Sequence, residues 1–358
     1  MTPRPLRLLF VKESQNWPRS NGHDVHGFHM MKALAARGHA VSLATAIPPV
    51  PQAIEGLPLY ALFALDDKAI FRPLPPFTAL QRKFANYFGM SDALSTGLAA
   101  ILKRTAFDAV IVVARNLLPI LSVVRGPARI WYPADDPAWH HLSRFKLRNR
   151  QTWSELKLAA VNALYERTFQ SFLDRIWVVS STDRAFTRTI TGCQKVDLIP
   201  NGVDADYYAS GGPCDIPSSA VFWGRLDFGP NVDALEWFLA HVWPRVLKIS
   251  PDARFDVFGY NATPRVRRLA EINRVNVFTD LPDIREEVQR RQVVVLPFVS
   301  GGGIKNKLLE AAAMGKAVVC SPTALNGLRR PRAAGFALPR TPDKWAEALD
   351  RKSTRLNS

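Results

Sequence analysis

Two lysines and a glutamate follow three consecutive glycines near the end of the chain. Residues 293–320 read VVVLPFVSGGGIKNKLLEAAAMGKAVVC. The turn itself consists of Gly301, Gly302, Gly303 and Ile304. Glycines let backbone N–H groups approach a ligand closely, and a helix N-terminus attracts an anion such as phosphate. Lys305 and Lys307 add full positive charges, and the Glu310 carboxylate can accept two hydrogen bonds from a ribose diol. The pattern is compatible with a site for a phosphorylated nucleoside.

The elements around this turn can be read from the spacing of apolar residues. Residues 293–296 form an apolar run typical of a buried parallel strand, and residues 317–320 form a second one. Between them, apolar residues recur at helical spacing from residue 304 to residue 312. The predicted order is strand, glycine turn, helix, strand. A simpler interpretation stays open, in which the turn is only flexible and Glu310 pairs with a neighbouring lysine on the surface.

The phrase LLEAAAMGKAVV resembles the acidic motif of glycosyltransferase family 4, retaining enzymes that use nucleotide sugars. In that family two glutamates separated by seven residues flank the sugar and the ribose. The resemblance implies that Glu310 is the second of them. The first falls on Gly302, so this chain lacks it and resembles a subgroup with GGIKNK at that place. The resemblance also implies an α/β fold of the GT-B type, with two doubly wound Rossmann-like domains whose parallel sheets face across a cleft.

Length, charge and cysteines agree with a two-domain enzyme. A chain of 358 residues suits two domains, and its formal net charge is +16. The basic residues are scattered without a nucleic-acid-binding motif, so nucleic acid is not expected as a partner. No run approaches about 18 consecutive apolar residues, and the N-terminus leads straight into a strand, so a cytoplasmic location is expected. The three cysteines have no metal-binding or disulfide spacing; they are Cys193, Cys214 and Cys320.

The N-terminal half starts with a predicted strand at residues 7–12, a polar loop and a helix from about Val25. Ligands bind at the first loop of such doubly wound sheets. The resemblance implies that Gly22 lets the backbone approach the donor's phosphate and sugar. Three histidines follow at intervals of three, namely His23, His26 and His29. They straddle a loop and a helix start without a nearby acidic or cysteine partner, so a metal site is not expected.

Two further predicted strands, at residues 108–113 and 128–132, end in polar residues. After the first, Arg115 and Asn116 occupy a region where many members of the family carry a histidine near the transferred sugar. The second runs into PADDPAWHHLS, a dense set of ionisable groups at a strand end. Asp135 or Asp136 can cap the following helix, or can contact an acceptor hydroxyl. We take Asp135 as a candidate catalytic residue.

Residues 69–104 interleave aromatic and basic side chains. They fit either an ordinary amphipathic helical insertion or a face that contacts an anionic membrane or a lipid-linked acceptor. A second basic cluster, at Arg144, Lys146, Arg148 and Arg150, could extend such a face.

The phrase IPNGVD, at residues 199–204, resembles the family's segment at the end of the N-terminal domain. We therefore expect an acceptor-side domain at residues 1–210 and a nucleotide-sugar-binding domain at residues 211–349. The second domain restarts with a strand that ends at Gly224 and Arg225, followed by a helix introduced by Pro230. The family carries a basic pair here for the diphosphate. Arg225 matches its arginine, whereas Pro230 replaces its lysine, so Lys305 and Lys307 are expected to supply the missing charge.

The last nine residues, DRKSTRLNS, resemble the in-frame translation of a sequencing adapter. We expect residues 350–358 to be a non-native tail that interrupts a helix opening at Thr341 and Pro342. Family members usually continue with further helices, so the chain is expected to be truncated.

Together these features predict a retaining glycosyltransferase that moves a sugar from a nucleotide-diphosphate sugar to a glycan or lipid-linked acceptor, without a metal or other cofactor. The resemblance implies a role in cell-surface polysaccharide or glycolipid synthesis, and peripheral contact with the inner face of the membrane is expected. The predicted catalytic residues are Arg225, Lys305, Lys307 and Asp135. The predicted donor-binding residues are Gly22, Gly224, Arg225, Gly301, Gly302, Gly303, Ile304, Lys305 and Glu310. A nucleotide-sugar epimerase and a non-catalytic sugar-nucleotide binder are the alternatives.

Overall fold

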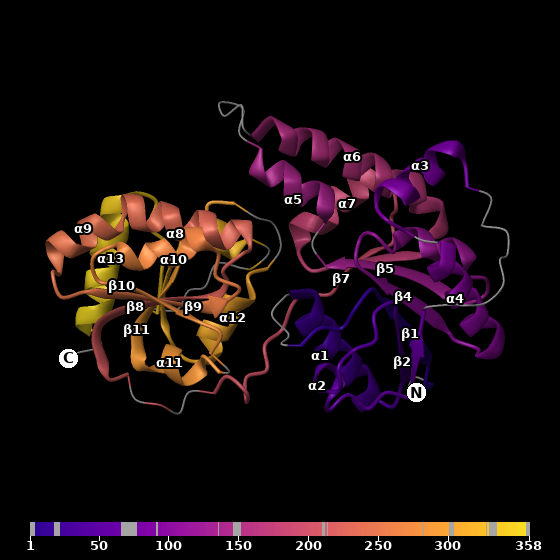
Figure 1. Cartoon of the computed structure of the whole chain (residues 1–358), viewed down its shortest axis with the longest axis horizontal. Coiled ribbons are helices and arrows are strands. Elements are labelled where there is room, and N and C mark those ends of the chain that lie inside the picture. Colours follow the sequence, from indigo (N-terminus) through magenta and orange to yellow (C-terminus); the bar gives the residue numbers. More distant parts are fainter. Residues whose placement is uncertain are drawn as a thin grey trace. The chain divides into compact units, whose positions relative to one another are not determined.

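The chain forms two units, each built on one parallel sheet (Figure 1). The computed structural model describes residues 4–17, 22–65, 77–90, 92–134, 136–145, 152–209, 212, 214–281, 283–300, 304–326, 328 and 335–355. Contacts divide the chain into unit 1, Met1–Pro200, and unit 2, Asn201–Ser358. Two parallel sheets with helices confirm the α/β architecture expected from the sequence.

Unit 1 holds a seven-stranded sheet with the order β3-β2-β1-β4-β5-β6-β7, in which each described pair is parallel. The strands are β1 (Arg7–Lys12), β2 (Ala40–Thr45), β3 (Ala61–Ala64), β4 (Ala109–Val113), β5 (Ala128–Ala134), β6 (Arg175–Val178) and β7 (Val196–Leu198). The helices are α1 (Gly22–Ala36), α2 (Pro51–Ile54), α3 (Ala79–Tyr87), α4 (Asp92–Arg104), α5 (Pro137–Arg144), α6 (Trp153–Phe169) and α7 (Ser181–Thr191), with short 3-10 helices η1 (Leu118–Val123) and η3 (Gln170–Phe172).

Unit 2 holds a six-stranded sheet with the order β10-β9-β8-β11-β12-β13, again with parallel pairs. The strands are β8 (Ile216–Arg225), β9 (Arg254–Tyr260), β10 (Val275–Thr279), β11 (Arg291–Leu296), β12 (Ala317–Cys320) and β13 (Phe336–Ala337). The helices are α8 (Gly229–His241), α9 (Trp243–Ile249), α10 (Pro264–Arg267), α11 (Arg285–Arg290), α12 (Asn306–Ala313) and α13 (Pro342–Arg355), with 3-10 helices η4 (Arg268–Glu271) and η5 (Pro322–Leu325). Helices α8, α9 and α13 lie on one side of the sheet and α11 lies on the other (Figure 1).

The strand order determines where a ligand can bind. In unit 1 the order reverses between β1 and β4, and in unit 2 it reverses between β8 and β11. A doubly wound sheet opens a crevice at this reversal, outside the carboxyl ends of the strands. The strands β4 and β11 are buried along their whole length, as their apolar runs predict for strands covered on both faces.

Three secondary-structure elements differ from what the sequence predicted. Helix α1 begins at Gly22 and not at Val25, so Gly22 is the first helical residue instead of a loop glycine. Strand β3 was missed because it is a short edge strand whose residues alternate between partly buried and exposed. Helix α13 continues through Asp350 to Arg355, so the helix is not interrupted where DRKSTRLNS begins.

The aromatic residues of α3 and its surroundings face mostly inward. The Phe77 ring packs 5.6 Å from Phe169, and Phe84 and Phe88 pack against the same apolar core. Tyr87 is different, because it is 63% exposed. Much of the aromatic pattern at residues 69–104 therefore serves the core of unit 1; residues 66–76, with Phe71 and Arg72, lie outside the described residues.

Candidate functional site

The chemistry-bearing residues of unit 2 gather where β8 and β11 end. Lys305 is the N-cap residue of α12, and Lys307 lies in its first turn. Lys305 is thus just outside the helix, although the sequence predicted both lysines inside it. Ile304 is 7% exposed and packs as an apolar side chain. Gly301, Gly302 and Gly303 lie outside the described residues.

Glu310 is held by aromatic side chains. Its Oε2 atom accepts a hydrogen bond from Trp223 Nε1 at 2.8 Å, and Tyr208 provides a further side-chain hydrogen bond. Burial raises the pKa of the Glu310 carboxyl, and the Trp223 bond, the Lys307 charge and the Tyr208 bond oppose that rise. These contacts fix the orientation of the carboxylate, while a carboxylate has about four acceptor positions to share.

The Lys307 ammonium has an amide and two aromatic rings as its contacts. Its Nζ is 3.4 Å from Asn231 Oδ1 and 5.7–5.8 Å from the ring centroids of Phe222 and Phe298. Burial lowers the pKa of Lys307 to about 8; the Glu310 charge opposes this shift and the Lys305 charge adds to it. The Lys305 ammonium is 5.5 Å from the Phe298 centroid. Two cations on one aromatic ring repel each other, so an anion bound between them is favoured.

Gly224 leaves space for the lysine. Its φ of 142° suits glycine, and a Cβ there would lie 2.6 Å from Lys307 Nζ and overlap Lys307 Cε. A glycine is also needed on the next strand, because a Cβ on Gly259 would overlap the carbonyl oxygen of Gly224. The paired glycines bring the ends of β8 and β9 close together and let the Lys307 side chain pass over the backbone.

Arg225 is already paired. Its Nη2 and Nε atoms donate to the two carboxylate oxygens of Asp227 at 2.7 and 3.0 Å. The hydrogen bonds to Arg225 hold the pKa of Asp227 below its ordinary value. Asn231 fixes the same turn, because its Nδ2 donates to the Arg225 carbonyl at 2.7 Å. Asp227 thus occupies the Nε edge of this guanidinium, and an anionic ligand can bind the remaining Nη1 and Nη2 N–H groups or displace the carboxylate.

The segment IPNGVD reaches the same helix. Asn201 Nδ2 donates to Asn306 Oδ1 at 2.7 Å, and Asn306 is the first residue of α12. Tyr208, a few residues further along, contacts Glu310 as described above. Both residues belong to unit 2 by their contacts. Asn201 thus helps to position the start of α12, and Tyr208 helps to position the Glu310 carboxylate.

Unit 1 carries a second set of polar residues at its own strand reversal. Lys12 Nζ at the end of β1 forms an ion pair of 2.7 Å with Asp24, and the two side chains are only 4% and 2% exposed. Lys12 also donates to Gln15, and burial lowers the pKa of the Lys12 ammonium. After β4, Ala114 has a φ of 93°, in the region that favours glycine. The strand reversal of unit 1 is therefore strained and charged at the position where such sheets bind ligands.

Asp136 caps α5, and a helix cap was one of the two roles that the sequence left open for Asp135 or Asp136. Its Oδ1 accepts from Trp139 N at 2.8 Å, and its Oδ2 accepts from Thr187 Oγ1 at 2.5 Å. Beneath it, Glu166 is fully buried, and burial together with the Asp136 charge raises the pKa of Glu166 well above its ordinary value. Asp135 lies outside the described residues, so its predicted role stays a prediction.

The structure thus brings five of the predicted residues to one region of unit 2, namely Gly224, Arg225, Lys305, Lys307 and Glu310. Gly22 belongs to unit 1. Sequence reasoning missed the neighbours that orient this cluster, which are Trp223, Tyr208, Asn231 and Phe298. A tryptophan directly before the glycine at the end of a buried strand was the available signal, because an indole N–H placed there needs a polar partner.

Each half of the chain matches a known glycosyltransferase family. Residues 20–207 match the family described as Glycosyltransferase Family 4, and residues 217–353 match the family described as Glycosyl transferases group 1. The first match covers more than half of the chain. No individually curated protein matches the sequence.

Solved structures share the fold at low sequence identity. HepE from Anabaena, determined with UDP and glucose, has a TM-score of 0.63 and 14% identity over 97% of this chain and 89% of its own. TarM, from S. aureus, has a TM-score of 0.70 and 8% identity over 98% of this chain and 92% of its own. WaaG, which is involved in lipopolysaccharide biosynthesis, has a TM-score of 0.60 and 14% identity over 98% and 91%.

Proposed function

We propose, from the premise that this chain belongs to glycosyltransferase family 4, that it transfers a sugar with retention from a nucleoside-diphosphate sugar held in unit 2. The observation that carries this assignment is the cluster at the ends of β8 and β11, where Glu310 and Lys307 lie three residues apart on one helix. The related enzyme HepE was determined with UDP, and GtfA from pneumococcus with UDP and GlcNAc.

The two charges have separate roles in this proposal. Glu310 accepts hydrogen bonds from the ribose diol, because Trp223 orients its carboxylate and leaves acceptor positions unused. Lys305 and Lys307 contact the diphosphate, with Arg225 reaching it after release from Asp227. As the bond to the sugar breaks, negative charge builds on the diphosphate, and fixed cations in a partly buried site stabilise it most at that moment. We therefore infer that the reaction needs no metal ion.

A donor and product analysis tests the assignment. The protein is screened with UDP, GDP and ADP by calorimetry, and the matching nucleotide sugars are then incubated with and without membrane-derived glycolipid acceptors. We expect one nucleoside diphosphate to bind preferentially and sugar transfer to require the acceptor. Change of the donor sugar without any acceptor would instead indicate an epimerase. Tight donor binding with neither reaction would indicate a non-catalytic binder.

We also propose that unit 1 contacts an anionic membrane or a lipid-linked acceptor. Helix α6 presents apolar residues along one exposed stripe, with Trp153 50% exposed, and Leu156 and Leu164 follow at helical spacing. Helix α3, which packs on α6, exposes Leu80, Lys83 and Tyr87. Among the helices that the structure describes, none has the length and apolar character of a membrane span. Aromatic and basic groups together suit the membrane interface.

Vesicle binding tests this surface. The protein should sediment with vesicles that contain phosphatidylglycerol, and salt should release it because the charge attraction is screened over about 8 Å at physiological ionic strength. Lys83→Glu and Trp153→Ser should each weaken sedimentation, whereas Arg37→Glu, at an exposed turn after α1, serves as the matched control. Equal binding to neutral vesicles would contradict an electrostatic contact.

A further inference from the structure

A cavity of about 350 Å³ lies at the carboxyl ends of β11 and β12, outside the cluster described above. Its nine lining residues come from α8, from the segments after β11, β12 and β13, and from α13. They are Trp237, Pro297, Phe298, Val299, Ser321, Pro322, Pro339, Arg340 and Trp345. Glu310, Lys307 and Arg225 do not line it. The Phe298 ring is shared, since the Lys305 ammonium lies 5.5 Å from its centroid.

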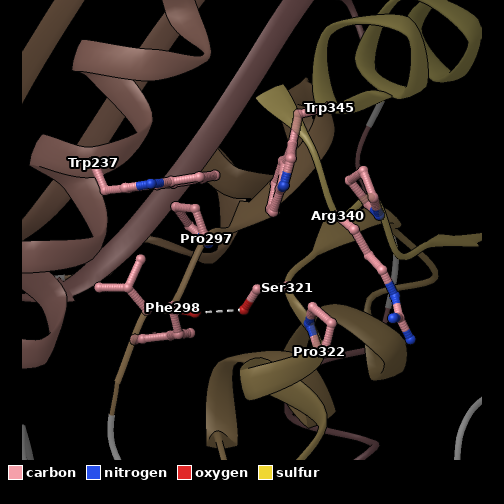
Figure 2. Close-up of a pocket in the computed structure, with 9 residues that line it drawn as sticks. Trp237, Pro297, Phe298, Ser321, Pro322, Arg340 and Trp345 are labelled. Carbon is pink, nitrogen blue, oxygen red and sulfur yellow. Dashed lines mark hydrogen bonds between the residues drawn. The ribbon is translucent and has the colours of Figure 1, made fainter. Parts of the chain in front are cut away.

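Two indoles form one side of the cavity. The rings of Trp237 and Trp345 meet edge to face at 5.9 Å and 68°. Trp345 is 1% exposed and also contacts Phe238, so it belongs to the core of unit 2. Trp237 is only half-buried. Figure 2 shows both indoles on one side of the cavity and Arg340 with Pro322 on the other. A ring that presents an apolar face of C–H groups can pack against such a surface.

The polar groups of the cavity favour a negative charge. Ser321 Oγ donates to the Phe298 carbonyl at 2.6 Å and accepts from Ala324 N at 3.2 Å, so its hydroxyl is largely engaged. Arg340 is exposed, and within the described part of the chain its guanidinium forms no hydrogen bond or ion pair. None of the nine described lining residues is acidic. A free guanidinium binds carboxylate and phosphate groups through paired hydrogen bonds.

We propose that this cavity binds one pyranose unit that carries an anionic substituent, as a subsite for an acidic glycan. The sugar's C–H face packs on Trp237 and its carboxylate or phosphate contacts Arg340. The volume is at the lower end of the range for ligand sites, which suits one sugar residue and not an oligosaccharide. The choice of a glycan rests on the proposed glycosyltransferase function, because a glycan acceptor or product is a ligand that such an enzyme meets, whereas the choice of an anionic substituent rests on Arg340.

Ligand-observed NMR and calorimetry test the proposal with four probes. These are methyl glucuronide, glucose 6-phosphate, methyl glucoside and inorganic phosphate. We expect the two anionic sugars to bind about tenfold more tightly than methyl glucoside, because only they make charge-assisted hydrogen bonds to Arg340. The better of the two identifies the anionic group. Inorganic phosphate lacks the apolar face and should bind more weakly than glucose 6-phosphate.

Variants separate the cavity from the donor cluster. Arg340→Gln should reduce the affinity for the anionic sugars to that for methyl glucoside, whereas Arg254→Gln, an exposed arginine on β9, should leave it unchanged. Trp237→Leu should weaken all sugars, and Trp237→Phe should retain much of the binding. UDP should bind every variant as it binds the wild type, and saturating UDP should not displace the sugars.

Unchanged affinity in Arg340→Gln, displacement by UDP, or no sugar binding to a protein that does transfer sugar would each overturn this inference. Sugar binding with the expected variant pattern in a protein that proves unable to transfer sugar would support the subsite and reject the proposed function instead.

Discussion

Glu310→Gln is the substitution that most directly tests the assignment of the donor cluster. The amide keeps the size of the side chain, and its oxygen can still accept the Trp223 N–H bond of 2.8 Å. The NH₂ group then faces the ribose as a donor, so hydrogen bonding survives in part while the negative charge is lost. A hydrogen bond to a charged group contributes about 1.5–3 kcal/mol, against about 0.5–1.5 kcal/mol for a neutral one.

Two ribose hydroxyls lose this charge assistance, so the substitution should cost about 1.5–3 kcal/mol of donor binding. That range corresponds to a roughly 10- to 150-fold increase in Kd. Calorimetric titration of the preferred nucleoside diphosphate, and of the same nucleoside without phosphates, measures the loss. Both ligands contain the ribose, so both should lose affinity in Glu310→Gln, whereas Lys305→Met should affect only the phosphorylated one.

Glu271→Gln is the matched control, because it removes the same charge from an exposed side chain of unit 2. Equal affinity of Glu310→Gln and wild type for both ligands, with normal folding by circular dichroism, would refute the ribose contact. In that case the carboxylate would serve only to hold Trp223 and Tyr208 in place.

Further predictions concern Lys307, Gly259 and Lys12. Affinity for the diphosphate should fall as pH rises through about 8, because the buried Lys307 ammonium then loses its proton; Lys307→Met should bind weakly and without this pH dependence, as calorimetry at several pH values would show. The folding stability of the protein without ligand should instead rise with pH between about 8 and the ordinary lysine pKa. In that range the unfolded chain binds more protons at Lys307 than the folded chain does. Gly259→Ala should cost about 3 kcal/mol or more in urea unfolding, because its Cβ meets the backbone oxygen of Gly224; wild-type stability would contradict that close approach. Lys12→Met should cost about 3–5 kcal/mol because Asp24 stays buried without its cation, and adding Asp24→Leu should recover much of the loss; a double variant no more stable than Lys12→Met would count against the pair.

The sequence allowed the grouping of Lys307 and Glu310 to be predicted, because these residues are close together in the chain. Lys307 and Glu310 are three residues apart on one helix, so helical spacing alone places them on neighbouring positions. The buried strands β4 and β11 could be predicted equally well, because a continuous apolar run is typical of a strand that is covered on both faces.

The partners of these residues could not be predicted in the same way. Trp223 is 87 residues from Glu310, and their contact depends on β8 lying beside β11 in the sheet. The Lys12 and Asp24 pair was missed for a different reason. A lysine at the end of an apolar strand is usually expected in solvent, and only the packing of α1 against the strand end shows that it is buried.

The pairing of Arg225 with Asp227 has a consequence for which anions the cluster accepts. The carboxylate is tethered two residues away and accepts from the Nε and Nη2 atoms, so it is a competitor at high local concentration for that edge of the guanidinium. A weakly held monoanion gains little by displacing it. A diphosphate that contacts Lys305 and Lys307 at the same time, as proposed above, would have enough attraction to exchange places with the carboxylate. Under the proposed function, the pair would thereby set a threshold of ligand charge below which this edge of Arg225 stays bound to Asp227.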